Sequence, residues 1–277
     1  MGIETIDDLG DPRVAVYRNV KDAALRDAQG LFVAESRLCV RRLLELGRHR
    51  VKSVFVTRVA LDALADVLDP DDLAFPIYLA SADLMKRVVG FDMHRGCVAA
   101  AERGHVPSLD SLLALEPRLI VGLEGVANPE NVGNVFRNAT AFGADAVLLS
   151  ADCADPLYRK AIRVSMGGTL RTPFARIDDW PDALGSLSEA GLTSLAFSTL
   201  RDAPDLAELK NAERTDRGFI LLFGAEGDGL RSATAAAADQ MIRIPMAEGV
   251  DSLNIATASG VALHHCFGLL NASAIAK

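Results

Sequence analysis

Short apolar segments alternate with longer segments along residues 119–270 of this 277-residue chain. The short segments are rich in Val, Leu, Ile and Phe, which is typical of buried β-strands, and the longer ones have the length of helices. The expected strands are residues 119–123, 146–150, 194–198, 219–223 and 241–244, and the expected helices include residues 132–142, 181–190 and 255–270. This alternation predicts an α/β fold in which a largely parallel sheet carries helices on both faces. Because ligands of such sheets lie beyond the carboxyl ends of the strands, the residues that follow each strand are the functional candidates.

A smaller α/β region is predicted before residue 105. Apolar residues at helical spacing predict helices over residues 38–46 and 61–68, and residues 51–57 and 97–101 have the composition of strands. A stretch containing Gly and Pro then interrupts the pattern before the next strand begins. We therefore expect two domains, residues 1–105 and residues 106–277.

The charge of the chain limits its partners. A formal net charge of −8 argues against a protein that holds nucleic acid by bulk charge alone. Basic residues nevertheless outnumber acidic ones by 11 to 8 within residues 1–58, and Arg37 and Arg41 belong to this group. A phosphate-binding face on the N-terminal domain and an ordinary solvated helix face are both consistent with this distribution.

Other features argue against a secreted, membrane-spanning or metal-binding protein. The four cysteines lie far apart without CxxC spacing, which predicts free buried thiols in a reducing cytoplasm. The acidic N-terminus lacks a secretion signal, and the charge-free stretch 252–276 contains too many polar residues for a lipid-facing span. The adjacent His264 and His265 would point in different directions on a helix, so we expect no metal site.

The segment after the first strand of the larger domain, residues 128–143, has the sequence NPENVGNVFRNATAFG. Pro129 and Gly133 are expected to shape a tight turn into a helix, and Asn131 is expected to cap that helix. Arg137 follows about two turns later, where its rigid guanidinium suits a phosphate in the same crevice. A capped helix with a surface arginine explains these residues equally well.

Two further strand ends carry polar residues. The strand at 219–223 runs into GAEGDGL, where glycines permit close approach of a ligand to the backbone and Glu226 or Asp228 is available to bind it. This turn lacks both the dinucleotide fingerprint and the P-loop lysine, and alone it favours a plain β–α turn. After the strand at 241–244, Ser252 is expected to cap a helix. Asn254 is costly at the start of an apolar segment unless its amide has partners.

The three segments in this order resemble the SpoU (TrmH-like) family of RNA ribose 2′-O-methyltransferases in the SPOUT superfamily. The resemblance covers residues 118–271 and includes three family motifs, residues 128–143, 222–230 and 244–258, with a further turn at 163–168. The N-terminal hundred residues resemble, more weakly, the small substrate-binding domain of many members, through residues 32–38 and 94–99.

The resemblance implies a fold, a cofactor and a partner. The C-terminal domain is expected to be a parallel-sheet methyltransferase domain that threads a deep trefoil knot and forms a homodimer through it. S-adenosylmethionine is expected to bind in the knot, and the matching positions are Gly224, Ile244, Met246 and Leu253. The substrate is expected to be ribosomal RNA, or less favourably transfer RNA. Arg137 is a candidate contact to it, and Arg37 and Arg41 are candidates because of the local excess of basic residues.

The resemblance also assigns catalytic roles. Arg137 matches the family's catalytic arginine and Asn131 its companion, while Glu226, Ser252 and Asn254 match the remaining polar residues. Because a guanidinium stays protonated, an electrostatic role for Arg137 is an alternative to general-base catalysis. A catalytically silent RNA-binding or ribosome-associated protein on the same scaffold is the alternative function. The missing dinucleotide fingerprint disfavours a nicotinamide-dependent enzyme.

Overall fold

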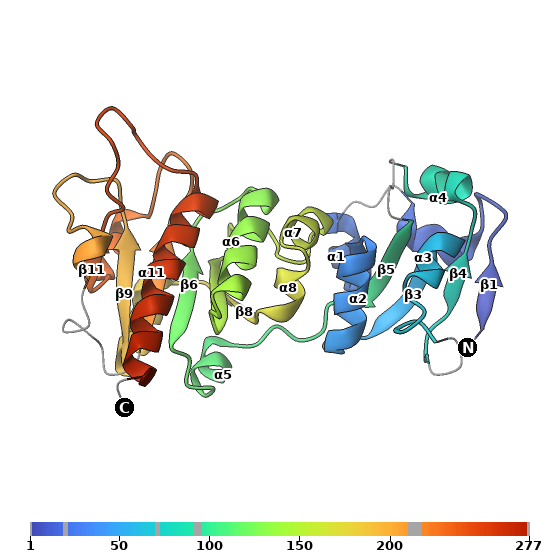
Figure 1. Cartoon of the computed structure of the whole chain (residues 1–277), viewed down its shortest axis with the longest axis horizontal. Helices are drawn as coiled ribbons and strands as arrows, with labels where there is room; N and C mark the ends of the chain where they lie inside the picture. Colours follow the sequence, from blue (N-terminus) through green and yellow to red (C-terminus); the bar gives the residue numbers. More distant parts are fainter. Residues whose placement is uncertain (1, 19–21, 70–72, 91–95, 210–217, 276–277) are drawn as a thin grey trace. The chain divides into compact units, whose positions relative to one another are not determined.

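A computed structural model describes residues 2–18, 22–69, 73–90, 96–209 and 218–275 (Figure 1). The chain divides into two units. The first unit comprises Met1–His105 together with Pro156–Arg171, and the second comprises Val106–Asp155 together with Thr172–Lys277. The segment Pro156–Arg171 lies within the expected C-terminal domain in sequence, yet it packs with the first unit.

The second unit is built on a six-stranded sheet in which every pair of neighbours is parallel, as the sequence predicts. The strand order is β11-β9-β10-β6-β7-β8. The strands are β6 (Leu119–Leu123), β7 (Ala146–Ser150), β8 (Phe174–Ile177), β9 (Leu192–Phe197), β10 (Gly218–Phe223) and β11 (Gln240–Ile242). The prediction gives the bounds of β6 and β7 and is displaced by one or two residues for β9 to β11. It misses β8, a four-residue edge strand that contains an arginine.

Helices cover this sheet on both faces. The helices of the unit are α5 (Leu109–Leu113), α6 (Pro129–Ala141), α9 (Trp180–Glu189), α10 (Ser232–Ala237), α11 (Ile255–Ile275) and the 3-10 helix η2 (Leu206–Glu208). Ile120, Leu148 and Ile220 project from one face into a buried cluster with Trp180 of α9. Since side chains alternate along a strand, the intervening residues face the other side, where α6 and α11 pack together (Figure 1).

The sheet has a topological switch point between β6 and β10. From β6 the chain proceeds to β7 and β8 on one side, whereas β10 lies on the other side beside β9. The backbone N–H of Glu124, directly after β6, donates to the carbonyl of Phe223 at the end of β10 with a donor–acceptor distance of 3.0 Å. The turns that follow these two strands therefore begin side by side, which is where open α/β sheets bind ligands.

The first unit contains a mixed five-stranded sheet in the order β1-β4-β3-β5-β2. Its strands are β1 (Ile3–Thr5), β2 (Leu31–Glu35), β3 (Val51–Val56), β4 (Ile77–Leu79) and β5 (Cys97–Glu102). Strands β1 and β3 pair parallel with β4, whereas β5 runs antiparallel to β2 and β3. Tyr17 and Phe55 stack at 5.5 Å between ring centroids in the core of this unit.

Six α-helices and one 3-10 helix are described in this unit. They are α1 (Asp22–Gln29), α2 (Arg37–Leu46), α3 (Arg58–Asp62), α4 (Ala82–Val89), α7 (Arg159–Val164), α8 (Gly168–Arg171) and η1 (Pro12–Tyr17). The predicted helix at 38–46 matches α2, whereas the one predicted at 61–68 is wrong, because α3 ends at Asp62 and turns follow. His94 and Arg95, part of the N-terminal resemblance, lie outside the described residues.

The cysteines agree with the expected burial. Cys39, Cys97, Cys153 and Cys266 are all free and buried. Burial raises the pKa of the Cys266 thiol to about 12. Within the described ranges no helix combines the length and the apolar character needed to cross a membrane.

Candidate functional site

Helix α6 begins one turn earlier than the sequence analysis expects. Asn128 is its cap, since its Oδ1 accepts a hydrogen bond of 2.9 Å from the N–H of Glu130. Pro129 occupies the first helical position, where its fixed φ is favourable and no N–H is needed. The expectation that Asn131 caps this helix is therefore wrong. Asn131 lies inside the first turn, only 6% exposed, and its side chain is free for a tertiary contact.

The turn after β10 folds back on itself. Ala225 and Gly229 exchange two backbone hydrogen bonds of 3.1 and 3.0 Å. A Cβ atom on Gly224 would lie 1.9 Å from the carbonyl carbon of Gly229, so no other residue fits at this position. Glu226 stands exposed at the tip of the turn.

The loop between β11 and α11 supplies the third part of the site. Helix α11 starts at Ile255, and the Oδ1 of Asn254 accepts a 2.8 Å hydrogen bond from the N–H of Ala256. Asn254 thus caps the helix, and the expectation that Ser252 does so is wrong, because Ser252 lies too far upstream. Ser252 is exposed and makes no hydrogen bond with the residues that the structure describes.

These three segments meet in one amide–carboxylate cluster, formed by Asn131, Glu226 and Asn254. The Nδ2 of Asn254 donates to Oδ1 of Asn131 at 3.3 Å and to Oε1 of Glu226 at 3.0 Å. Since its Oδ1 caps α11, the amide of Asn254 is used on both sides and its orientation is fixed. This explains how a polar side chain is tolerated here. The Nδ2 of Asn131 and the Oε2 of Glu226 have no hydrogen-bond partner in the described part of the chain.

Arg137 is not part of this cluster. It is exposed on α6 and makes no hydrogen bond or ion pair with the described residues. Arg137 lies six positions after Asn131, and at about 100° per residue the two side chains leave the helix about 120° apart. Within one chain, the side chain of Arg137 therefore points to the solvent, whereas the side chain of Asn131 belongs to the cluster.

The positions expected to hold the cofactor lie on the loops at the carboxyl end of the sheet (Figure 1). Gly224 follows β10, while Ile244, Met246 and Leu253 belong to the loop after β11. Large apolar side chains are exposed at this end, including Leu200 at 54%, Val250 at 48% and Leu253 at 36%. Exposed apolar side chains at this end of the sheet, together with the close-packed backbone at Gly224, fit a flat heteroaromatic ring such as adenine.

An ion pair fixes the start of the loop after β11. The Nε of Arg243 lies 2.6 Å from a carboxylate oxygen of Asp205. The backbone of Arg243 donates to the carbonyl of Pro204 at 2.9 Å and accepts from the N–H of Leu206 at 2.8 Å. The segment that leads into Ile244 is thereby held against the segment before η2.

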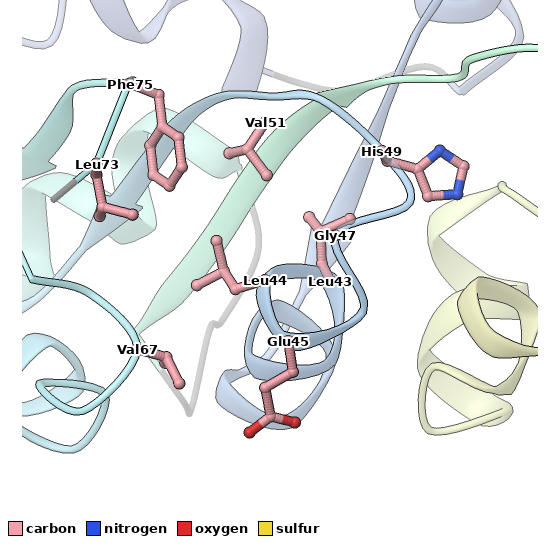
Figure 2. Close-up of a pocket in the computed structure, with 9 residues that line it drawn as sticks. All are labelled: Leu43, Leu44, Glu45, Gly47, His49, Val51, Val67, Leu73 and Phe75. Carbon is pink, nitrogen blue, oxygen red and sulfur yellow. The ribbon is translucent and has the colours of Figure 1, made fainter.

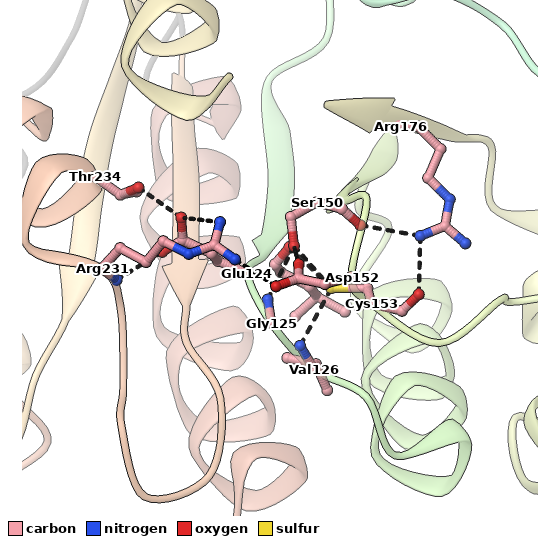
Figure 3. A network of polar contacts seen from close by, with 10 residues as sticks. Glu124, Gly125, Val126, Ser150, Asp152, Cys153, Arg176, Arg231 and Thr234 are labelled. Atoms are coloured by element: carbon pink, nitrogen blue, oxygen red, sulfur yellow. Dashed lines mark hydrogen bonds and ion pairs between the residues drawn. The ribbon is translucent and has the colours of Figure 1, made fainter. Parts of the chain in front are cut away.

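A buried carboxylate that the sequence analysis did not single out lies at the end of β6 (Figure 3). Glu124, directly after β6, is only 3% exposed. Its carboxylate accepts from the backbone N–H of Arg231 at 2.8 Å, from the hydroxyl of Thr234 at 2.7 Å and from the Arg231 guanidinium at 3.4 Å. Because Arg231 follows the glycine turn, Glu124 anchors the exit of that turn to the end of β6. A carboxylate placed immediately after an apolar strand is the signal that could have revealed it.

The same network continues to the end of β7. Arg231 also pairs with Asp152, which accepts a hydrogen bond from the hydroxyl of Ser150. That hydrogen bond and the nearby guanidinium lower the pKa of Asp152. The thiol of Cys153 donates to the carbonyl of Leu123 at 3.3 Å, and burial raises its pKa. The strand ends that surround the cluster are therefore cross-linked by polar contacts.

The surface has two hollows, one in each unit. One of about 360 Å³ belongs to the first unit and is lined mainly by apolar side chains, together with Glu45 and His49 (Figure 2). The Nδ1 of His49 lies 3.2 Å from the carbonyl of Glu102, and burial lowers the pKa of this histidine. The other, of about 320 Å³, lies in the second unit beside Met241. No residue of the amide–carboxylate cluster lines either hollow.

The arginines expected to bind RNA differ in availability. Arg37 is exposed and has no ion-pair partner among the described residues. Arg41 donates to both carboxylate oxygens of Asp66, at 2.5 and 2.8 Å, and to Glu45 at 3.5 Å. The guanidinium of Arg41 holds the pKa of Asp66 below its usual value. The charge of Arg41 is thus neutralised within its own unit.

The two adjacent histidines point apart, as predicted. The ring of His264 packs edge-on against Phe142 at 5.7 Å, whereas Nε2 of His265 lies 3.4 Å from the carbonyl of Leu209. In the part of the chain that the structure covers, no three His, Cys, Asp or Glu side chains gather in a metal-binding arrangement.

Comparison with known proteins adds to this geometry. Residues 118–264 match the model of the SpoU rRNA Methylase family. An uncharacterised tRNA/rRNA methyltransferase of Mycobacterium bovis is 41% identical over 268 residues, which cover 95% of this chain and 91% of that protein. A 23S rRNA (guanosine-2′-O-)-methyltransferase of Nitrosomonas europaea is 31% identical over 194 residues, covering 69% of this chain and 73% of that protein. An AdoMet-bound rRNA methyltransferase from Sinorhizobium meliloti has a similar structure, with a TM-score of 0.80 and 25% identity over 95% of this chain and 97% of that one.

Proposed function

Because the chain belongs to the SpoU rRNA methylase family, we propose that it transfers the methyl group of S-adenosylmethionine to a ribose 2′-hydroxyl of ribosomal RNA. The name of the Nitrosomonas europaea relative supports the ribose position and the ribosomal substrate, and the Sinorhizobium meliloti structure supports the cofactor. Transfer RNA is the second substrate class, in keeping with the name of the Mycobacterium bovis relative.

The observation that carries this proposal is the amide–carboxylate cluster at the switch point of the sheet. Asn254 joins residues that lie 123 and 28 positions away in the sequence, one from each of the other two motifs. Two amides and a carboxylate brought together at the ligand-binding end of a parallel sheet suit the orientation of a hydroxyl group. Asn254, whose amide is fully used, is assigned a positioning role. The unused Nδ2 of Asn131 and Oε2 of Glu226 are assigned to the substrate.

The cofactor, when bound, supplies a methyl group already activated by its sulfonium, so the protein has mainly to bind, align and assist loss of the hydroxyl proton. Gly224 and Ile244 would offer backbone groups to the adenosyl moiety, and Met246 and Leu253 would cover its apolar surface. The fold-back of the glycine turn and the Arg243–Asp205 pair hold the two loops that carry these residues.

Arg137 is assigned an electrostatic role. A guanidinium stays charged at accessible pH, so it can bind a phosphate beside the reacting ribose and stabilise negative charge that develops on the 2′-oxygen. Its exposure on α6 leaves it available to RNA. Ser252, exposed beside the cluster, is proposed as a further contact to the substrate or cofactor.

We also propose that the second unit is knotted and forms a homodimer through α6 and α11. After the edge strand β11 the chain returns to the centre, where α11 packs on β10 and α6, as a knotted segment requires. Val261 and Phe267 are exposed large apolar residues on α11, and Ala141 is exposed on the neighbouring α6. Since Arg137 is exposed on α6 as well, a dimer across these helices would bring it near the interface.

Transfer of labelled methyl groups to unmodified ribosomal RNA and transfer RNA, in separate reactions, tests the function. The expected result is label in ribosomal RNA at a ribose that resists alkali, lost with Arg137→Ala and retained with Arg58→Ala, an exposed arginine of the first unit. Cofactor binding without transfer to any RNA would favour the catalytically silent RNA-binding protein. Absence of cofactor binding would remove the methyltransferase function altogether.

A further inference from the structure

The segment Pro156–Arg171 changes the charge of the unit on which it packs. It contains four basic residues and no acidic one. Residues 1–105 alone hold 15 basic and 16 acidic residues, whereas the first unit with this segment holds 19 and 16, a net charge of +3. The second unit keeps 10 basic and 21 acidic residues, a net charge of −11. In a chain that is acidic overall, positive charge is therefore concentrated on the first unit.

Apolar contacts attach this segment firmly. Helix α7 packs against β2, and α8 packs against α2. The thiol of Cys39 lies 3.6 Å from the carbonyl of Ile162. The side chains buried in this attachment are Leu157, Ala161, Ile162 and Leu170.

Polar contacts fix the register of the segment along α2. Arg163 pairs with Glu35 at 3.4 Å, beside the start of α2. Further along, Arg42 donates to the carbonyl of Met166, and beyond the end of the helix Arg48 donates to the carbonyl of Arg171. The segment therefore runs alongside α2 over its whole length, which is about 15 Å for ten residues.

The same place contains two non-glycine residues in conformations that favour glycine. Ser36, the cap of α2, has φ 89° and ψ 149°, and Met166, between α7 and α8, has φ 55°. Each such conformation costs on the order of 1–3 kcal/mol and is often found where a ligand is held. Met166 is also among the exposed large apolar residues.

We propose that this α2–α7 surface, defined by Arg37, Lys160, Arg163 and Arg171, binds the phosphate backbone of the RNA substrate. All four side chains are exposed, and Arg163 pairs with Glu35. Lys160 lies three residues before Arg163 and so shares its face of α7. A row of about 15 Å can meet several phosphates, since a duplex strand carries one charge per ~3.4 Å of axis.

This inference rests on the proposed function for the identity of the ligand and assigns the part of the chain that holds it. By sequence the segment belongs to the matched methylase region, residues 118–264, but its basic side chains serve the N-terminal unit. The proposed RNA-binding surface thus combines residues 1–105 with the segment Pro156–Arg171. Residues 1–105 alone do not form it.

Salt dependence of RNA binding by the full-length protein tests the surface. We expect the triple variant Arg37→Gln, Arg163→Gln, Arg171→Gln to bind unmodified ribosomal RNA at least ~10-fold more weakly at low salt. We expect the slope of log K against log salt to become shallower by about 2, because each lost phosphate contact removes about 0.7–0.9. S-adenosylmethionine affinity is expected to stay unchanged, because the cofactor residues lie in the other unit.

The matched control carries Lys52→Gln, Arg58→Gln and Arg87→Gln, three exposed basic residues on β3, α3 and α4 of the same unit. It removes the same charge and is expected to keep the wild-type slope more closely than the triple variant. Wild-type slope and methyl transfer in the triple variant would overturn the surface while leaving the proposed function intact. If the triple variant shows the shallower slope but the wild-type protein transfers no methyl group, the surface is supported and the proposed function is overturned.

Discussion

Replacing Glu124 by glutamine tests whether the buried carboxylate holds the ends of β6 and β10 together. The two carboxylate oxygens have different partners. Oε2 accepts a hydrogen bond from the backbone N–H of Arg231, and Oε1 accepts hydrogen bonds from the Thr234 hydroxyl and the Arg231 guanidinium. A glutamine of the same size keeps one acceptor oxygen and replaces the other by an NH₂ group. It would therefore set two donors against each other and remove the charge that strengthens the remaining bonds.

The expected loss of stability follows from these contacts. A hydrogen bond to a charged group contributes about 1.5–3 kcal/mol, and a buried donor left unpaired costs about 1–3 kcal/mol. The guanidinium of Arg231 is 59% exposed, so its ion pair with Glu124 is screened and adds at most about 1 kcal/mol. We expect Glu124→Gln to lower the unfolding free energy of the second unit by about 2–3 kcal/mol.

Urea unfolding followed by tryptophan fluorescence measures this change. The chain has one tryptophan, Trp180, which is buried in the core of the second unit and so reports on that unit. With a slope of about 2 kcal/mol per M, the midpoint should fall by roughly 1 M while the slope stays constant. Glu189→Gln, at the exposed end of α9, is the matched control and should shift it little. A Glu124→Gln midpoint equal to that of the control would refute the anchoring role.

Three further consequences can be measured. Gly224→Ala would place a Cβ 1.9 Å from the carbonyl carbon of Gly229, so the turn must open, and we expect calorimetric S-adenosylmethionine affinity to fall at least ~10-fold. Gly185→Ala, at an open helical position with no atom within 4 Å, should instead add about 0.5–1 kcal/mol of stability and leave affinity unchanged. Because burial lowers the folded-state pKa of His49 below its unfolded value of about 6.5, the unfolded state takes up the proton first. The first unit should lose stability as pH falls below about 6.5, less so in His49→Gln, as followed by the near-UV signal of the three tyrosines, which all lie in that unit.

The sheet of the second unit could be predicted because its strands are buried on both faces. Such strands are continuous apolar runs, and β6 and β7 stand out from their neighbours for that reason. Strand β8 escaped prediction because it is short, lies at the edge and contains Arg176, whose guanidinium donates to the carbonyls of Ser150 and Cys153. That use of a charged residue depends on tertiary contacts that periodicity does not reveal.

The residues of the cluster could be named from the sequence, but their contacts could not. The cost of an asparagine at position 254 predicts partners for its amide, and the structure provides two. The choice of cap for α6 depended on whether the helix begins at Pro129 or later, and a shift of one turn moved Asn131 from the cap into the cluster. Helix ends are set by local hydrogen bonds that compete within a few residues, so sequence patterns place them poorly.

The separation of charge between the two units bears on how an acidic protein can act on RNA. A methyltransferase must hold a polyanion at one place and keep it from binding at many others. With a net charge of −11 the second unit repels phosphates in general, whereas a first unit of +3 attracts them locally. Only a few phosphates would then be neutralised, so binding should depend on salt less steeply than in proteins with long basic faces. Discrimination among RNA molecules must consequently come from the shape of the RNA and from contacts to its bases, and overall electrostatic attraction contributes little to it.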